Sequence, residues 1–233
     1  MSSTLPVLGL RHRECADPSR LFEKTTMASK VAEESASLHS KWFIPMATHV
    51  AEKLLNFDAY LHHHNDTDQH HELVNGVLAS TPPPTLRHLL IARFLEQLLD
   101  REIQRLGLDW LCLREAGLRT GVRKSRLMDV CVVTREQAGE ILHRPAVFET
   151  PPRLAVEVVS EESVKRDYRY KRSEYAAVEV PEYWIVDPLR ETVSVLLLEE
   201  GLYEVTEFSG ETRVVSRLFN ELATTANEML NPP

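Results

Sequence analysis

A continuous apolar run at residues 153–160, RLAVEVVS, constrains the fold of this 233-residue chain more than any other segment. The run predicts a strand that is covered on both faces, because a strand with one face in water would alternate apolar and polar residues. Such a strand needs partner strands at its edges and further layers packed against it. The rest of the chain must therefore supply a sheet and the helices that cover it.

Two segments predict the covering helices. From Thr85 to Leu106 apolar residues recur every three or four positions, which predicts a long amphipathic helix that Gly107 caps at its C-terminus. Residues 161–178 again show helical spacing, and Pro181 marks the end of that helix.

Strand patterns occur on both sides of these helices. HELVNGVLAS at 71–80 predicts a hairpin around Asn75-Gly76, since both residues of this dipeptide tolerate positive φ. SRLMDVCVVT at 125–134 predicts a strand, and YWIVDP, TVSVLLL and YEVTEF predict three more, the last two joined by Glu200-Gly201. This order of helices and strands implies an α/β or α+β sheet with helices packed against it.

The length suits one domain with a sizeable core. Residues 1–45 show no sustained period and predict a poorly ordered N-terminal extension, so we place the domain at 46–222 and a C-terminal tail at 223–233. The natural start of the chain stays open between Met1, Met27 and Met46.

Several classes of protein are excluded by composition. No stretch approaches the ~20 consecutive apolar residues of a membrane-spanning helix, so no membrane association is expected. The first 25 residues lack the pattern of a secretory signal, so we expect a cytoplasmic location. Cys15, Cys112 and Cys131 are widely spaced and fit neither a disulfide framework nor a zinc ribbon.

The net charge of −8 argues against a protein that coats nucleic acid by bulk attraction. Residues 179–233 carry that whole imbalance, with eleven acids and three arginines, while 114–126 and 165–172 are locally basic. These basic stretches are either solvated faces of a hairpin and a helix or parts of a nucleic-acid-binding face. The candidates for nucleic-acid contacts are Arg123, Lys124, Arg126, Lys165 and Arg166.

Two carboxylates, Asp129 and Glu157, lie inside strands that otherwise have an interior composition. An ionised carboxylate there is costly unless it is paired, hydrogen-bonded or bound to a metal. If the two strands are neighbours, the carboxylates can converge and form a site for Mg²⁺, which prefers oxygen ligands. A metal-bound water could then attack a phosphodiester.

Lys171 lies fourteen residues after Glu157, on the following helix, and can supply a cation near the phosphate. Asp167 and Tyr175 lie four residues before and after it, so the three side chains share one helix face. The alternative is that Asp167 and Lys171 form an ordinary surface ion pair and that the strand carboxylates only border their strands.

The segment from Glu157 to Pro188 resembles the signature of the Uma-two family of restriction-endonuclease-like proteins, within the PD-(D/E)XK superfamily. The matching positions, without a gap, are Glu157, Val158, Ser160, Asp167, Lys171, Tyr175, Val180, Pro181, Glu182, Tyr183, Trp184, Val186, Asp187 and Pro188. Upstream, HELVNG at 71–76, Arg87-His88 and RLMDVCVV also resemble family motifs. The resemblance covers about residues 55–220.

The resemblance implies a restriction-endonuclease-like fold, a mixed central β-sheet flanked by helices, here with extra β-hairpins. It implies Asp129 and Glu157 as metal ligands and Glu72 as an additional acid. Lys171 would replace the lysine that usually follows the glutamate by two residues, where this chain has Val159. The auxiliary candidates are His88, Asp167 and Tyr175. His88 would contact phosphate or orient Glu72, and the alternative is that it is a solvated or capping residue.

Two positions depart from the family pattern. Met128 replaces the proline before Asp129, and Glu179 replaces the glycine before Val180. Glycine at a helix end commonly adopts a left-handed conformation, which costs other residues roughly 1 kcal/mol. Neither change removes a predicted ligand.

These inferences predict a Mg²⁺-dependent DNA endonuclease, with Mn²⁺ as a substitute metal. The chief alternative is a catalytically inactive nucleic-acid-binding or protein-interaction module on the same fold. A third interpretation is a hydrolase of a small phosphate compound. DNA is the expected partner, and a homodimer is expected from symmetry alone, because cutting two strands is simplest with two related sites.

Overall fold

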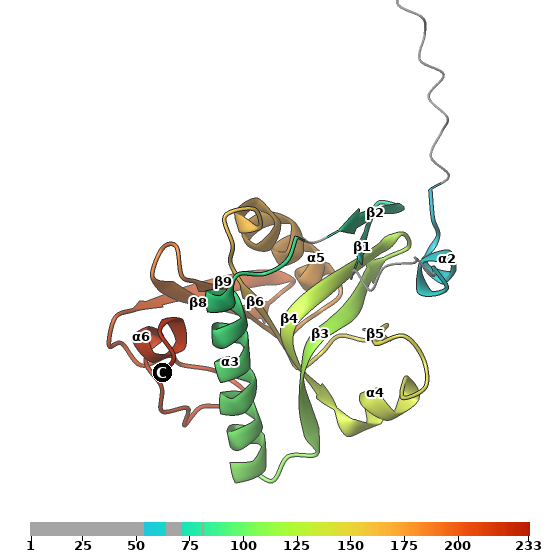
Figure 1. Ribbon diagram of the computed structural model, residues 1–233. Helices are drawn as coiled ribbons and strands as arrows, with labels where there is room; N and C mark the ends of the chain where they lie inside the picture. The colour runs from blue at the N-terminus through green and yellow to red at the C-terminus, as the bar shows by residue number, and fades with distance from the viewer. Residues whose placement is uncertain (1–53, 64–70, 81) are drawn as a thin grey trace, which may run out of the picture. The chain divides into compact units, whose positions relative to one another are not determined.

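A mixed sheet of nine strands forms the centre of the structure (Figure 1). The structure is a computed structural model that describes residues 54–63, 71–80 and 82–233. The predicted extension at 1–45 and the three candidate starts lie outside the described residues.

The strands follow the order β2-β1-β4-β6-β7-β8-β9, and β3 pairs with β4 and with β5. Among the strands that the structure describes, only the β6–β7 and β3–β5 pairs are parallel. The strand bounds are β1 His71–Val74, β2 Val77–Ser80, β3 Trp110–Gly121, β4 Lys124–Thr134, β5 Val147–Phe148, β6 Leu154–Val158, β7 Glu182–Asp187, β8 Thr192–Glu199 and β9 Leu202–Ser209.

Helices cover both faces of this sheet. The long helix α3 and the short C-terminal α6 pack on one face, and α4 and α5 lie on the other (Figure 1). The helix bounds are α2 Phe57–Leu61, α3 Leu86–Arg105, α4 Arg135–Glu140, a π-helix η2 Arg166–Lys171, α5 Arg172–Ala177 and α6 Ala226–Leu230. The strand predicted from the apolar run is β6, whose five residues are all buried. Because helices cover both faces of a mixed sheet, the predicted fold class is confirmed.

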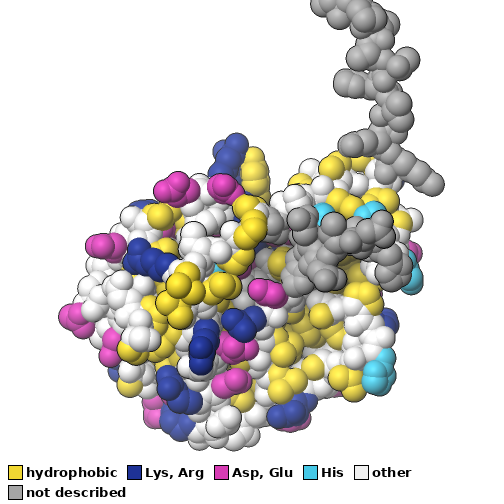
Figure 2. Space-filling model, viewed as in Figure 1, with side chains coloured by type: hydrophobic (Ala, Val, Ile, Leu, Met, Phe, Trp, Pro, Cys, Tyr) yellow, Lys and Arg dark blue, Asp and Glu magenta, His cyan; other side chains and the backbone are white. Residues whose placement is uncertain are grey.

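The predicted turns have the expected backbone. Asn75 and Gly76 both have positive φ, 52° and 89°, in the β1–β2 hairpin. Gly107 has φ 61° after α3, and the bonds from its N–H to Gln104 and from Leu108 N–H to Ile103 close the helix as a Schellman motif. None of the described helices is both long and apolar enough to cross a membrane. On the face shown in Figure 2, basic and acidic side chains lie next to one another among apolar ones.

The predicted C-terminal tail at 223–233 is wrong. Thr225 begins α6 with a capping box, in which its side chain and that of Glu228 each bind the other's backbone N–H. Ala226, Met229 and Leu230 are buried against the α3 face of the sheet. The hydrophobic pattern of a five-residue helix is too short to recognise in a sequence, although its cap residues are visible.

Candidate active site

The site begins at one edge of β4, which two different strands share. Strand β1 pairs with β4 at Ser125, and β6 pairs with it at Val130–Val132. Leu127 lies between these pairings, and its backbone binds side chains instead. Its N–H donates to Glu72 Oε1 at 3.2 Å, and its carbonyl accepts from Lys171 Nζ at 2.7 Å. The fork between β1 and β6 therefore creates a polar position inside the sheet.

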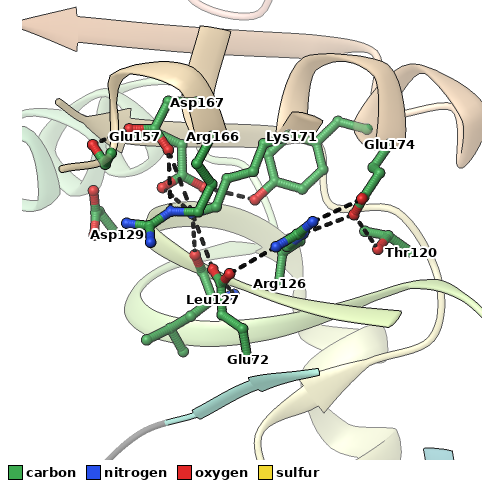
Figure 3. A network of polar contacts seen from close by, with 12 residues as sticks. Glu72, Thr120, Arg126, Leu127, Asp129, Glu157, Arg166, Asp167, Lys171 and Glu174 are labelled. Carbon is green, nitrogen blue, oxygen red and sulfur yellow. Dashed lines mark hydrogen bonds and ion pairs between the residues drawn. The ribbon is translucent and has the colours of Figure 1, made fainter. Parts of the chain in front are cut away.

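Lys171 is the centre of the site (Figure 3). Its Nζ lies 2.6 Å from Glu157 Oε2, 3.4 Å from Glu72 Oε1 and 3.9 Å from Asp167 Oδ1. Burial alone would lower the pKa of Lys171, but the carboxylates of Glu157, Glu72 and Asp167 hold it above its ordinary value. The ammonium group therefore stays protonated although its side chain is only 3% exposed.

Lys171 is the last residue of a π-helix, and its side chain contacts β4 and β6 of the sheet. The η2 segment contains both Asp167 and Lys171, and α5 continues directly from Arg172. A π-turn is wider than an α-turn and is common at functional sites. The structure brings Asp167, Lys171 and Tyr175 to one buried face, as the spacing predicted.

Glu157 uses both of its oxygens in this cluster. Oε2 accepts from Lys171, and Oε1 accepts from the Tyr175 hydroxyl at 2.6 Å. Burial raises the pKa of Glu157 well above its ordinary value, and the nearby Asp129 and Asp167 raise it further against the opposing effect of Lys171. A surplus of negative charge therefore surrounds this one lysine.

Asp129 connects the buried cluster to solvent. Its Oδ2 accepts the Val158 N–H at 2.7 Å, because β4 and β6 are neighbours as the convergence hypothesis required. Its Oδ1 lies 3.3 Å from His88 Nε2, and the two side chains are 24% and 16% exposed. Burial would raise the pKa of Asp129 and lower that of His88, but their mutual attraction shifts both in the opposite direction.

Asp167 is only half satisfied. Its Oδ2 accepts from the Ser163 hydroxyl, while Oδ1 has no hydrogen-bond partner among the described residues. Burial raises the pKa of Asp167 above its ordinary value. The Oδ1 oxygen therefore has only longer ion-pair contacts among the described residues, 3.9 Å to Lys171 Nζ and 3.8 Å to Arg166 Nε.

The prediction that Arg126 contacts nucleic acid is wrong. Its side chain is 4% exposed and binds Glu72 and Glu174, so no donor faces solvent. Thr120 and Lys124 also contact Glu174, at 2.8 and 3.4 Å. Glu72 is equally buried, and although burial would raise its pKa, Lys171 and Arg126 hold it below its ordinary value.

The other basic candidates lie at different places. Arg123 lies in the β3–β4 turn and is exposed, and Lys124 is half-buried beside Glu174. Lys165 is exposed, with Nζ 5.5 Å from the Tyr170 ring centre, while the Arg166 side chain is 28% exposed at the site. The Arg166 Nε has no hydrogen-bond partner among the described residues.

The donor set fits Mg²⁺ better than a metal that needs a full protein cage. Within the described ranges, no three His, Cys, Asp or Glu side chains are arranged to hold a metal ion. Mg²⁺ usually takes only one or two carboxylates and keeps several waters. Asp129 and Glu157 lie on neighbouring strands and would supply two such carboxylates.

Sequence reasoning missed Glu174 and the backbone of Leu127. Glu174 lies three residues after Lys171, which places it on the same side of the helix, and this spacing was a usable signal. No pattern could reveal Leu127, because its role comes from the fork between β1 and β6 and not from its side chain.

Comparison with known proteins defines the class first. A crystal structure of "a putative nuclease belonging to DUF820" from Anabaena variabilis matches with a TM-score of 0.63 and 17% identity, over 76% of this chain and 97% of that one. This match shows that the two chains share a fold. No curated protein sequence matches the chain.

The family is also shown. The Uma2 model, described as "Putative restriction endonuclease", matches residues 57–227. The chain therefore belongs to the Uma2 family, and the resemblance seen in the sequence is confirmed.

Proposed function

We propose that this protein is a Mg²⁺-dependent endonuclease that hydrolyses phosphodiester bonds in DNA, with Mn²⁺ as a substitute metal. The observation that carries the proposal is the convergence of Asp129, Glu157 and Lys171 from β4, β6 and η2. These three groups are far apart in sequence, and the same fold is found in nuclease-like proteins. Family membership supports the same reaction class.

Asp129 and Glu157 would hold the metal. When bound, Mg²⁺ supplies a more acidic water as nucleophile and stabilises the charge that develops on the phosphate. Tyr175 fixes the rotation of the Glu157 carboxylate through its 2.6 Å hydrogen bond. His88 orients the Asp129 carboxylate from the side that is open to solvent.

Lys171 would stabilise the transition state. Its protonated Nζ lies next to Glu157 and can donate a hydrogen bond to a non-bridging phosphate oxygen or to the attacking water. Glu72 faces the same ammonium, but its two oxygens accept hydrogen bonds from Arg126 and from the Leu127 N–H. Glu72 therefore serves as an anchor for the cluster rather than as a proton carrier.

Arg166 and Lys165 would bind the DNA backbone. Arg166 leads into the site, its side chain is 28% exposed, and its guanidinium can donate to a phosphate oxygen. Lys165 is exposed beside it. Replacing both by Gln should lower the slope of log K against log salt by about 2, because each phosphate contact contributes about 1. Arg123→Gln, at the β3–β4 turn, tests whether the contact surface extends that far.

Nicking of supercoiled plasmid tests the proposal. We expect cutting by the wild type with Mg²⁺ or Mn²⁺, none with EDTA, and none by Asp129→Ala or Glu157→Ala prepared in parallel. Equal cutting by all three proteins would identify a contaminant and contradict the site. Salt-sensitive DNA binding without cutting would favour an inactive binding module, and cutting of small phosphodiesters alone would favour a small-molecule hydrolase. A homodimer, which we propose for double-strand cutting, is tested by sedimentation of the same samples.

A further inference from the structure

Glu174 and Arg126 form a two-pronged ion pair beside the site. Arg126 Nε donates to Glu174 Oε2 and Nη2 donates to Oε1, both at 2.8 Å. The remaining prong, Nη1, donates to Glu72 Oε2 at 2.9 Å. Arg126 is 4% exposed and the Glu174 side chain 10% exposed, so this guanidinium has a single well-defined position.

The pair of Arg126 and Glu174 is connected to Lys171 in two ways. Glu174 lies three residues after Lys171 on the same continuous helical segment. At the other end, Glu72 Oε1 lies 3.4 Å from Lys171 Nζ. Figure 3 shows Arg126 between Glu72 and Glu174, with Lys171 close to the same group. The ion pair thus connects the helix that carries Lys171 to β4 and to β1.

We propose that Arg126 and Glu174 are positioning residues that fix the rotation of the η2–α5 segment and hold the Lys171 ammonium beside Glu157. The proposal rests on the proposed function for what Lys171 does, but not for where it is held. The planar fork of Arg126 sets both the distance and the direction of Glu174, which a lysine could not do. Thr120 completes the geometry by donating to Glu174 Oε2 at 2.8 Å.

A purely structural role would not require these charges. Buried ion pairs often contribute no more to stability than apolar residues of similar size, because desolvation offsets the attraction. The α5 segment already packs through Tyr175, which is fully buried. A charged fork at this place gives directional control of the helix that apolar packing alone would not give.

Lysine acetylation followed by mass spectrometry tests the proposal without any cleavage assay. The probe is a soluble N-hydroxysuccinimide acetate, and the proteins are the wild type, Glu174→Gln and Glu174→Ala as full chains. Lys171 should be protected in the wild type. In both variants its labelling should accelerate about 10- to 100-fold, because the hydrogen bonds between charged groups that hold the segment in place are lost. Exposed Lys165 should label equally in all proteins and serves as the internal standard.

Glu182→Gln is the matched control, because Glu182 is also a buried acid and its hydrogen bonds go to groups other than Lys171 and Arg126. It should leave Lys171 protected. Protection of Lys171 in both Glu174 variants would overturn the proposal. Faster labelling of Lys171 in Glu182→Gln, equal to that in the Glu174 variants, would also overturn it. Because Glu174→Gln keeps the side-chain shape, it decides the result even if the alanine variant does not fold.

Cleavage gives a second readout if the wild type cuts DNA. Glu174→Gln should then lower kcat while leaving KM unchanged, since Lys165 and Arg166, which we propose as the DNA contacts, lie elsewhere. If the wild type cuts nothing, the proposed function fails, yet the labelling pattern still decides whether Arg126 and Glu174 position Lys171.

Discussion

Two buried glutamates on adjacent strands show how differently one sheet can use the same side chain. Glu157 on β6 and Glu182 on β7 are each 1% exposed. Glu182 accepts four hydrogen bonds: from Trp184 Nε1 and the Ser216 hydroxyl on one oxygen, and from the Arg217 and Leu218 N–H groups on the other. All four donors are uncharged groups, so this carboxylate stabilises the packing of the C-terminal segment.

Glu157 has a different environment. It shares Lys171 with Glu72 and Asp167, and Asp129 is a further acid close enough to raise its pKa. Burial alone therefore does not identify a functional acid. Competition among several acids for one cation is the better indicator of a functional site, because such surplus charge is costly unless a cation or substrate compensates it.

The largest stability effect should come from removing the shared cation. Lys171→Met leaves the carboxylates of Glu157, Glu72 and Asp167 facing one another, so the free energy of unfolding should fall by about 3–5 kcal/mol. Urea unfolding measures it, with Lys165→Met as the exposed control, which should change stability by no more than about 0.5 kcal/mol. Equal stabilities of the two variants would contradict the central place of Lys171.

Glu182→Gln should lower the free energy of unfolding by about 1–3 kcal/mol. The new amide NH₂ must face either the Trp184 and Ser216 donors or the two backbone N–H groups, and the backbone groups cannot rotate to accept. Thermal unfolding at pH 7 measures the loss. A stability unchanged from wild type would show that Glu182 is not the structural member of the pair.

The same change at Glu157 should have the opposite sign. Glu157→Gln removes surplus charge and keeps an acceptor for Lys171, so we expect a gain of about 0.5–2 kcal/mol at pH 7. Because the pKa of Glu157 is raised in the folded protein, ionising it destabilises that state as pH rises above the ordinary value of 4.5. The gain should therefore shrink as pH falls toward 4.5, and a loss at pH 7 that persists at low pH would refute this explanation.

The smallest effect concerns the helix end beyond Lys171. Glu179 has φ 61°, as expected where the family has glycine, and its N–H and that of Val180 close α5 as a Schellman motif. Glu179→Gly should raise the free energy of unfolding by about 0.5–1 kcal/mol by relieving backbone strain. Differential scanning calorimetry can detect this gain, and no gain would mean that other contacts compensate the strained φ.

The sequence predicted elements better than it predicted the environment of individual charges. The apolar run at β6, the amphipathic α3 and the Asn75-Gly76 turn follow from local periodicity and turn chemistry, and each is found in the structure. Arg126 shows the limit. Its basic neighbours suggested a surface role, and only the positions of β1 and α5 relative to β4 reveal that Glu72 and Glu174 enclose it.

The residues of the candidate site could be predicted from local sequence, but their contacts could not. Asp129 and Glu157 could be selected because charges are rare in strand interiors, and Lys171 because of helix spacing and family resemblance. The hydrogen bonds that define their roles cross between strands far apart in sequence, such as the one from Val158 N–H to Asp129. Local patterns contain no information about such contacts.

Parallel cleavage assays of Glu157→Gln and Glu182→Gln test the central claim most directly. Both variants change one buried carboxylate to an amide, and supercoiled plasmid with Mg²⁺ serves as substrate, with rates normalised to folded protein. We predict that Glu182→Gln cuts like the wild type and that Glu157→Gln loses at least about 100-fold, the scale of removing one charge-stabilising group. Retained cutting by Glu157→Gln, or equal loss in both variants, would contradict the assignment of the Lys171 cluster as the active site.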